Sequence, residues 1–141
     1  MKIPFRFRLL VHAVSMALFV TGVAWELIDR FVHVTTTIGE MKHPAEPWVL
    51  RAHGAAALLS VFVFGQLYSS HVRPSWRAGR KRGSGGGLVT VITALIASGY
   101  LLYYAGGDEL RDFVARFHFW LGAVAPLPFL FHLFRRSARR A

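Results

Sequence analysis

Five of the seven histidines in this chain lie inside or at the edges of long apolar segments. They are His12, His53, His71, His118 and His132. An ionisable side chain is costly inside a lipid bilayer, and those found there generally have a function. Imidazole is also the most common metal-binding side chain in proteins. These five histidines are therefore the candidate functional residues.

Helical spacing arranges these histidines in pairs. At about 3.6 residues per turn, His71 follows His53 by five full turns, so the two share one face of a helix. His132 follows His118 by slightly under four turns, and these two also share a face. At a rise of about 1.5 Å per residue, the second pair spans about 21 Å along the axis. That distance accommodates two planar cofactors at different depths.

Facing imidazoles from neighbouring helices are the axial ligands of a b-type haem, an arrangement that suits electron transfer rather than oxygen chemistry. The second and fourth apolar segments are expected to run from the outer to the inner face, and the first in the opposite direction. His53 and His118 then form a pair near the outer face. Near the inner face, His132 has two candidate partners, His12 and His71. The iron ligands are expected among these five residues.

Residues beside the histidines suit the same cofactor. Gly54 follows His53, and Gly122 lies one turn after His118, so both leave room for a macrocycle. Arg51 and Arg116 precede these histidines by two residues each. They are candidates for binding the haem propionates. An equally good interpretation is that both arginines extend from helix ends to the membrane interface.

Four apolar segments are long enough for a helix to cross a bilayer, which takes about 20 residues. They cover residues 9–28, 50–72, 88–104 and 113–134. We expect an all-α membrane protein, a single domain over residues 1–141 that forms an up-down bundle of four transmembrane helices. Pro126 and Pro128 predict a kink in the fourth helix, because proline lacks an amide donor. The glycine-rich run at 83–87 predicts a flexible loop.

The distribution of charge predicts how the helices are oriented. The formal net charge is +10, and twelve of the seventeen basic residues fall in three segments that contain no acidic residue, 2–8, 73–82 and 135–140. All seven acidic residues lie in the alternate regions. By the positive-inside rule, both termini and the middle loop are cytoplasmic, and the bacterial inner membrane is the expected location. No nucleic-acid partner is expected, because the charge follows the topology.

Two further observations limit the possible functions. The chain contains no cysteine, which excludes thioether-attached haem, thiolate-bound iron–sulfur clusters and disulfides. The basic start and small residues before Trp25 also fit a cleavable secretory signal. The alternation of charge over four segments, however, requires the first segment to remain.

Short motifs in three of the segments support a family resemblance. They are Arg-Leu-Leu-Val-His at 8–12, Arg-Ala-His-Gly at 51–54, and His118 with Gly122, followed by His132. The chain resembles the small bacterial four-helix di-haem cytochromes b, which are related to the cytochrome b subunits of membrane-bound formate dehydrogenases and nickel–iron hydrogenases. The resemblance implies two haems, one held by His53 and His118 and one by His12 and His132. His71 departs from the family pattern, so the inner ligand stays open between His12 and His71.

The expected function is transmembrane electron transfer between a quinone pool and a periplasmic redox partner, such as a c-type cytochrome or a catalytic subunit docked on the acidic outer loops. Glu26, Asp29 and His12 are candidates for handling the protons of quinone. The chain is expected to serve an oxidoreductase complex rather than to act as an enzyme alone. The alternative is a haem-free membrane anchor or assembly subunit, whose histidines form hydrogen bonds between helices.

Overall fold

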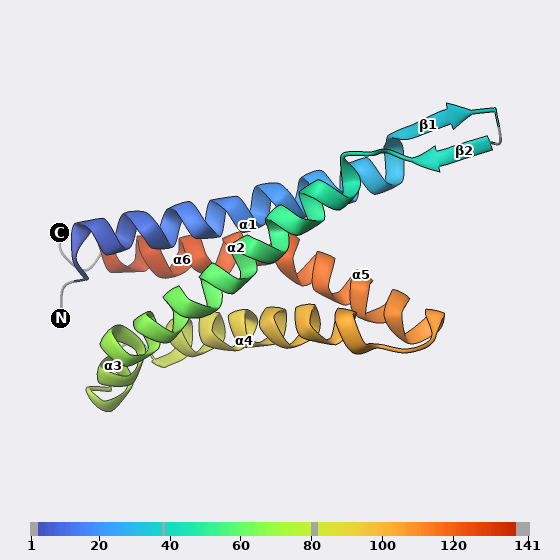
Figure 1. Cartoon of the computed structure of the whole chain (residues 1–141). Helices are drawn as coiled ribbons and strands as arrows, with labels where there is room; N and C mark the ends of the chain where they lie inside the picture. Colours follow the sequence, from blue (N-terminus) through green and yellow to red (C-terminus); the bar gives the residue numbers. More distant parts are fainter. Residues whose placement is uncertain (1–2, 38, 80–81, 138–141) are drawn as a thin grey trace. The chain divides into compact units, whose positions relative to one another are not determined.

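The computed structural model describes residues 3–37, 39–79 and 82–137. The chain forms two compact units, Met1–Gln66 and Leu67–Ala141, and each is described by itself. Figure 1 shows the elements along the chain. Every long element in the described residues is a helix, so the predicted all-α class is confirmed.

The first unit consists of two long helices joined by a short hairpin (Figure 1). Helix α1 covers Phe5–Phe31 and α2 covers Glu46–Leu67. Between them, strands β1 (His33–Thr36) and β2 (Gly39–Lys42) pair antiparallel, with His33 opposite Lys42. Sequence reasoning treated this segment only as a loop. Its run of valine and threonine has the β-branched side chains that favour an extended backbone, which accounts for the strand.

The second unit begins with a π-helical turn, η1 (Tyr68–Val72), and a short helix, α3 (Arg73–Arg77). Three further helices follow: α4 (Arg82–Tyr104), α5 (Asp108–Val124) and α6 (Pro126–Ser137). Helix α4 packs against both α5 and α6. It carries no histidine and no charge within its apolar part, and its role is to complete the packing of this unit.

Two helix boundaries differ from the sequence prediction. The second spanning stretch runs from Glu46 to Arg77, because η1 and α3, with Pro74 in the first turn of α3, continue it beyond Val72. Helix α4 begins at Arg82, so the expected flexible loop at 83–87 is wrong: these glycines are helical. Close packing explains the glycine at one of these positions, since a Cβ added at Gly86 would lie 3.3 Å from the Trp76 ring.

The predicted break in the fourth spanning segment is confirmed. Helix α5 ends at Val124 and α6 begins at Pro126. Ala125, which separates them, keeps helical backbone angles. The change of direction visible between α5 and α6 in Figure 1 therefore comes from the missing amide donor at Pro126.

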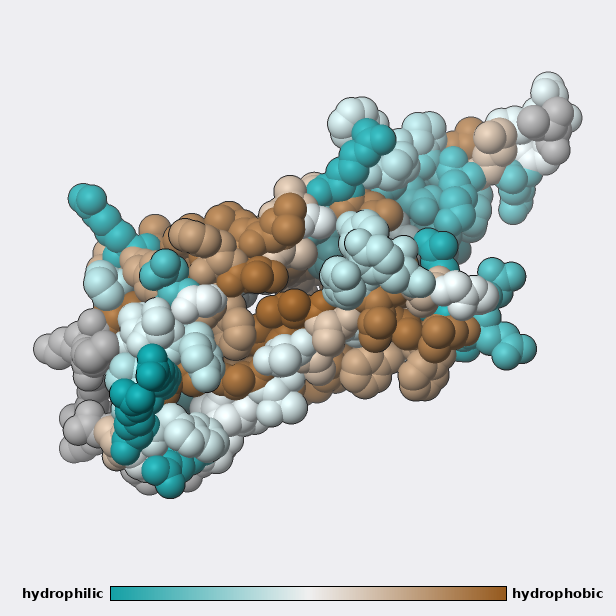
Figure 2. All heavy atoms as spheres, turned by 60° about the horizontal axis from the view of Figure 1, so that its bottom comes forward, coloured by the Kyte–Doolittle hydropathy of each residue, from teal (hydrophilic) through white to brown (hydrophobic). Residues whose placement is uncertain are grey.

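Four stretches are long and apolar enough to cross a membrane: Phe5–Phe31, Glu46–Arg77, Arg82–Tyr104 and Asp108–Phe134. Each contains and extends one of the four predicted segments. Large apolar side chains such as Phe62, Leu58 and Phe19 are exposed on the helices rather than gathered in a core. On the face shown in Figure 2, apolar side chains cover the middle stretches of the helices, and hydrophilic ones gather near their ends. By length and composition this is a multi-pass membrane protein whose helices contact lipid.

Candidate functional site

His53 of α2 lies against α1 within the first unit. Its Nδ1 is 2.9 Å from the hydroxyl oxygen of Thr21. The next residue, Gly22, supports the ring: an added Cβ there would come within 3.2 Å of His53 Cε1. Such a contact is tighter than nine in ten real Cβ contacts, so glycine lets the ring approach α1 without a shift.

His118 of α5 has the same surroundings on α4 in the second unit. Its Nδ1 is 2.8 Å from the hydroxyl oxygen of Ser98. A Cβ added at the following residue, Gly99, would lie 3.3 Å from His118 Cε1. The hydroxyl and the glycine therefore meet adjacent atoms of the imidazole, Nδ1 and Cε1, as Thr21 and Gly22 do for His53.

His132 of α6 meets a third pair of this kind, also on α4. Its Nδ1 is 3.3 Å from the Ser84 hydroxyl oxygen. A Cβ at Gly85 would be 3.8 Å from His132 Cε1, an ordinary van der Waals distance. This support is looser than the other two.

A hydroxyl residue followed by glycine is thus the shared feature of three histidine environments: Thr21–Gly22, Ser84–Gly85 and Ser98–Gly99. We call these the hydroxyl–glycine pairs. Sequence reasoning did not identify these pairs. A signal was present, because the two Ser-Gly dipeptides of α4 are separated by the same interval along the chain as His118 and His132.

His71 lies in η1, and its ring centroid is 6.5 Å from that of His132, with the ring planes at 85°. Single π-helical turns within longer helices occur often at functional sites. Two imidazoles on one iron have centroids about 6 Å apart, because each metal–nitrogen bond is about 2 Å long and each ring centre lies roughly 1 Å beyond its nitrogen. The separation between His71 and His132 is compatible with axial ligation and is also that of an edge-to-face ring contact.

The other predicted pairings join the two units and stay predictions. His53 belongs to the first unit and His118 to the second, and the same holds for His12 and His132. His12 lies within α1, between two and three turns before Thr21. The chemistry of the donors nevertheless fits a b-type haem, since every candidate ligand is an imidazole and three of them have Nδ1 hydrogen-bonded, as metal-binding imidazoles usually do.

The residues expected to flank a haem have mixed surroundings. A Cβ at Gly122 would contact Leu95 of α4 at 3.7 Å, so this glycine contributes to the packing of α5 against α4. Gly54 lies in α2, directly after His53. The guanidinium of Arg51 lies over the Trp48 ring, 4.7 Å from its centroid, an arrangement that suits a helix end at the membrane interface. Arg116 lies in α5, two residues before His118.

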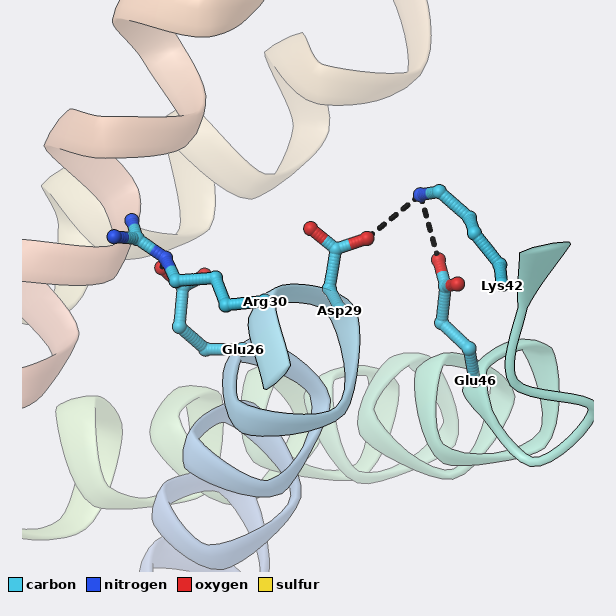
Figure 3. Close-up of polar contacts among 5 residues, drawn as sticks. All are labelled: Glu26, Asp29, Arg30, Lys42 and Glu46. Atoms are coloured by element: carbon cyan, nitrogen blue, oxygen red, sulfur yellow. Dashed lines mark hydrogen bonds and ion pairs between the residues drawn. The ribbon is translucent and has the colours of Figure 1, made fainter. Parts of the chain in front are cut away.

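Ion pairs tie the hairpin to the ends of α1 and α2 (Figure 3). Lys42 Nζ of β2 is 2.6 Å from Asp29 Oδ1 and 3.1 Å from Glu46 Oε1. These hydrogen bonds, first to Asp29 and then to Glu46, raise the pKa of Lys42 above its ordinary value. Glu26 pairs with Arg30 one turn later on α1.

These ion pairs affect two expectations from the sequence: proton handling by Glu26 and Asp29, and an acidic docking surface on the outer loops. Glu26 and Asp29 are each bound to a cation, so accepting a proton from quinol would cost either residue its ion pair. Asp29 and Glu46 share Lys42, so these two carboxylates are compensated and would contribute little to the expected acidic docking surface.

Comparison of the chain with protein families, with curated proteins and with solved structures found no match.

Proposed function

We propose that this chain is a di-haem b-type cytochrome of the bacterial inner membrane that transfers electrons across the membrane. The observation that carries the proposal is the paired environment on α4. His118 meets Ser98–Gly99 and His132 meets Ser84–Gly85, and the interval along the chain is the same for the two histidines as for the two pairs. Two similar imidazole environments about 21 Å apart along the helices suit two cofactors at two depths.

The residues divide into two proposed sites. His53 and His118 are the proposed ligands of the outer haem. His132 is one proposed ligand of the inner haem, and the second is His71 or His12. The 6.5 Å ring separation supports His71, while the family resemblance favours His12. When bound, haem supplies a one-electron carrier, and the protein supplies its spacing, its axial nitrogens and its apolar surroundings.

In this proposal, one end of the chain exchanges electrons with a quinone pool, and the other serves a periplasmic c-type cytochrome or catalytic subunit. His12 remains a candidate for handling the protons of quinone, since the structure places cations beside Glu26 and Asp29. The proposed orientation has both termini in the cytoplasm, as the basic segments 2–8, 73–82 and 135–140 indicate.

The hydrogen bonds of His53 and His118 also support the second candidate function, a haem-free anchor or assembly subunit. A hydroxyl on one helix that meets an imidazole on another is an ordinary contact between transmembrane helices. The two candidate functions are distinguished by whether the chain binds haem.

The deciding experiment is a reduced-minus-oxidised absorbance spectrum of the detergent-purified chain, with haem counted per polypeptide, after expression with adequate haem supply. We expect the α-band of a low-spin b-type cytochrome and two haems per chain. One haem would support an electron carrier that does not cross the membrane alone. A chain without haem would refute the proposal and favour the anchor.

A further inference from the structure

The hydroxyl of Thr21 has one proton and three neighbours that could accept it: two backbone carbonyl oxygens and His53 Nδ1. Thr21 Oγ1 donates to the carbonyl oxygen of Ala17 at 2.6 Å, with the Leu18 carbonyl as a second acceptor at 3.3 Å. The same oxygen lies 2.9 Å from His53 Nδ1. Because its proton points to the helix backbone, Oγ1 meets the imidazole as an acceptor. This geometry favours the tautomer of His53 that carries its hydrogen on Nδ1.

Ser98 offers His118 the same kind of acceptor. Its hydroxyl donates to the Leu95 carbonyl at 3.2 Å, and its oxygen lies 2.8 Å from His118 Nδ1. The imidazole again donates from Nδ1. In a neutral imidazole with the hydrogen on Nδ1, the lone pair that binds a metal is on Nε2.

Glycine completes each arrangement. Rings that rest 3.2 Å from the Cβ position of Gly22 and 3.3 Å from that of Gly99 have little freedom to turn toward these helices. The glycine fixes the ring, and the hydroxyl fixes the tautomer. Both are the functions of the residues that surround a metal ligand.

We propose that Thr21–Gly22 and Ser98–Gly99 are positioning sites that hold His53 and His118 as Nδ1-protonated ligands and lower the reduction potential of the haem they bind. This proposal rests on the proposed function. A hydrogen bond from Nδ1–H to oxygen makes the imidazole a stronger electron donor at Nε2. A stronger donor favours ferric over ferrous iron, so the hydroxyls lower the potential.

The test compares hydroxyl variants by potentiometric titration of the purified haem protein. Ser98→Ala and Thr21→Val remove the acceptor, whereas Ser98→Thr and Thr21→Ser keep it. Thr90→Val is the matched control: Thr90 donates to the Gly86 carbonyl at 3.1 Å, the same kind of backbone bond on the same helix as Ser98. It shows what the loss of such a hydroxyl does to helix stability alone.

We expect Ser98→Ala and Thr21→Val to raise the midpoint potential of one haem, with the conservative variants near the wild type. A tenfold weakening of the ferric complex relative to the ferrous one corresponds to about 59 mV for a one-electron couple. Ser84→Ala should shift the other haem less, because its oxygen is 3.3 Å from His132 Nδ1. A shift no larger than that of Thr90→Val would overturn the proposal.

A second measurement separates this proposal from the proposed function. Nitrogen-15 NMR of histidine-labelled protein distinguishes the two tautomers, in the diamagnetic ferrous state if haem is bound and directly if it is absent. We expect the hydrogen on Nδ1 of His53 and His118. A chain without haem refutes the cytochrome, and its tautomers still test the hydroxyl–glycine pairs. A hydrogen on Nε2 overturns the positioning proposal even in a chain that contains two haems.

Discussion

Ser98 Oγ lies 2.8 Å from His118 Nδ1, and the Ser84 hydroxyl contacts His132 Nδ1. Ser84 precedes Ser98 by the same number of residues as His132 follows His118. Helix α4 and the α5–α6 segment therefore stay in antiparallel register over about 21 Å. The register survives the break at Pro126, which lies between the two histidines. A helix that bends but keeps its register presents both imidazoles to one neighbouring helix.

The first prediction concerns Gly99. Gly99→Ala would place a Cβ 3.3 Å from His118 Cε1, so the ring would have to shift by a few tenths of an ångström, and we expect this to disturb its contact with Ser98. We expect weaker binding of the outer haem, about 10–100-fold in affinity, as is typical when a residue supporting a metal ligand is changed. The affinity would be measured as the loss of haem per chain on dilution or in competition with a haem-free haem-binding protein.

Gly87→Ala is its matched control on α4, because no described atom lies within 4 Å of a Cβ added there. Alanine at that position should stabilise the helix by about 0.5–1 kcal/mol and leave both haems bound. Equal haem loss in the two variants would mean that Gly99 matters only through the backbone.

The second prediction identifies the inner ligands. Iron with two axial imidazoles takes one nitrogen from each side, so the inner haem needs His132 and one further histidine. We expect His132→Ala to reduce the count from two haems to one, and only one of His12→Ala and His71→Ala to do the same. Haem stoichiometry and the low-spin spectrum of each variant give the result.

His43→Ala is the control for this series, because His43 Nδ1 accepts the Ala45 amide in the segment before α2, outside the apolar helices. It should retain both haems. Retention of two haems by His132→Ala would contradict the whole assignment of the inner site.

Apolar length determined most of what could be predicted of the fold. Helices were expected at all four spanning stretches because crossing a bilayer requires about 20 apolar residues, a constraint readable from the sequence alone. The break at Pro126 was predictable for an equally local reason. Gly83 to Gly87 were misread, since glycine signals flexibility in a loop but close approach in a packed helix. Only the position of Trp76 against Gly86 distinguishes the two.

The candidate site was predictable to a smaller extent. The histidines could be identified because ionisable side chains are rare in apolar transmembrane helices. Their supports did not, because serine, threonine and glycine are common in transmembrane helices and become informative only when a neighbouring helix is in place. Likewise the contact of His71 with His132 depends on how η1 packs against α6, and helical spacing within one segment cannot give it.

The third prediction concerns Lys42 and pH. Its pKa is raised in the folded chain, so its bonds to Asp29 and Glu46 stabilise the fold fully below the ordinary lysine value of 10.5 and are lost as pH rises above it. Lys42 is largely exposed, which limits the effect to that of surface ion pairs. Lys42→Met should lower Tm by roughly 3 °C at neutral pH. Thermal unfolding in detergent at pH 7 and at high pH would measure it.

The difference between Lys42→Met and the wild type should shrink at high pH and at high salt. Glu40→Gln in the same strand is a suitable control, since it changes an exposed charge without touching the pairs of Lys42. A difference in Tm that stays constant with pH would mean that the lysine acts by packing rather than by charge.

The last prediction tests the orientation in the membrane. The natural chain has no cysteine, so a single cysteine can be labelled without removing others. Glu40→Cys lies in β2, on the side predicted to be periplasmic, and Ser75→Cys lies in α3, on the side predicted to be cytoplasmic. A membrane-impermeant maleimide should label Glu40→Cys in intact spheroplasts and Ser75→Cys only after the membrane is permeabilised. The reverse pattern would place His53 and His118 at the cytoplasmic end and move the proposed periplasmic partner to the other pair of histidines.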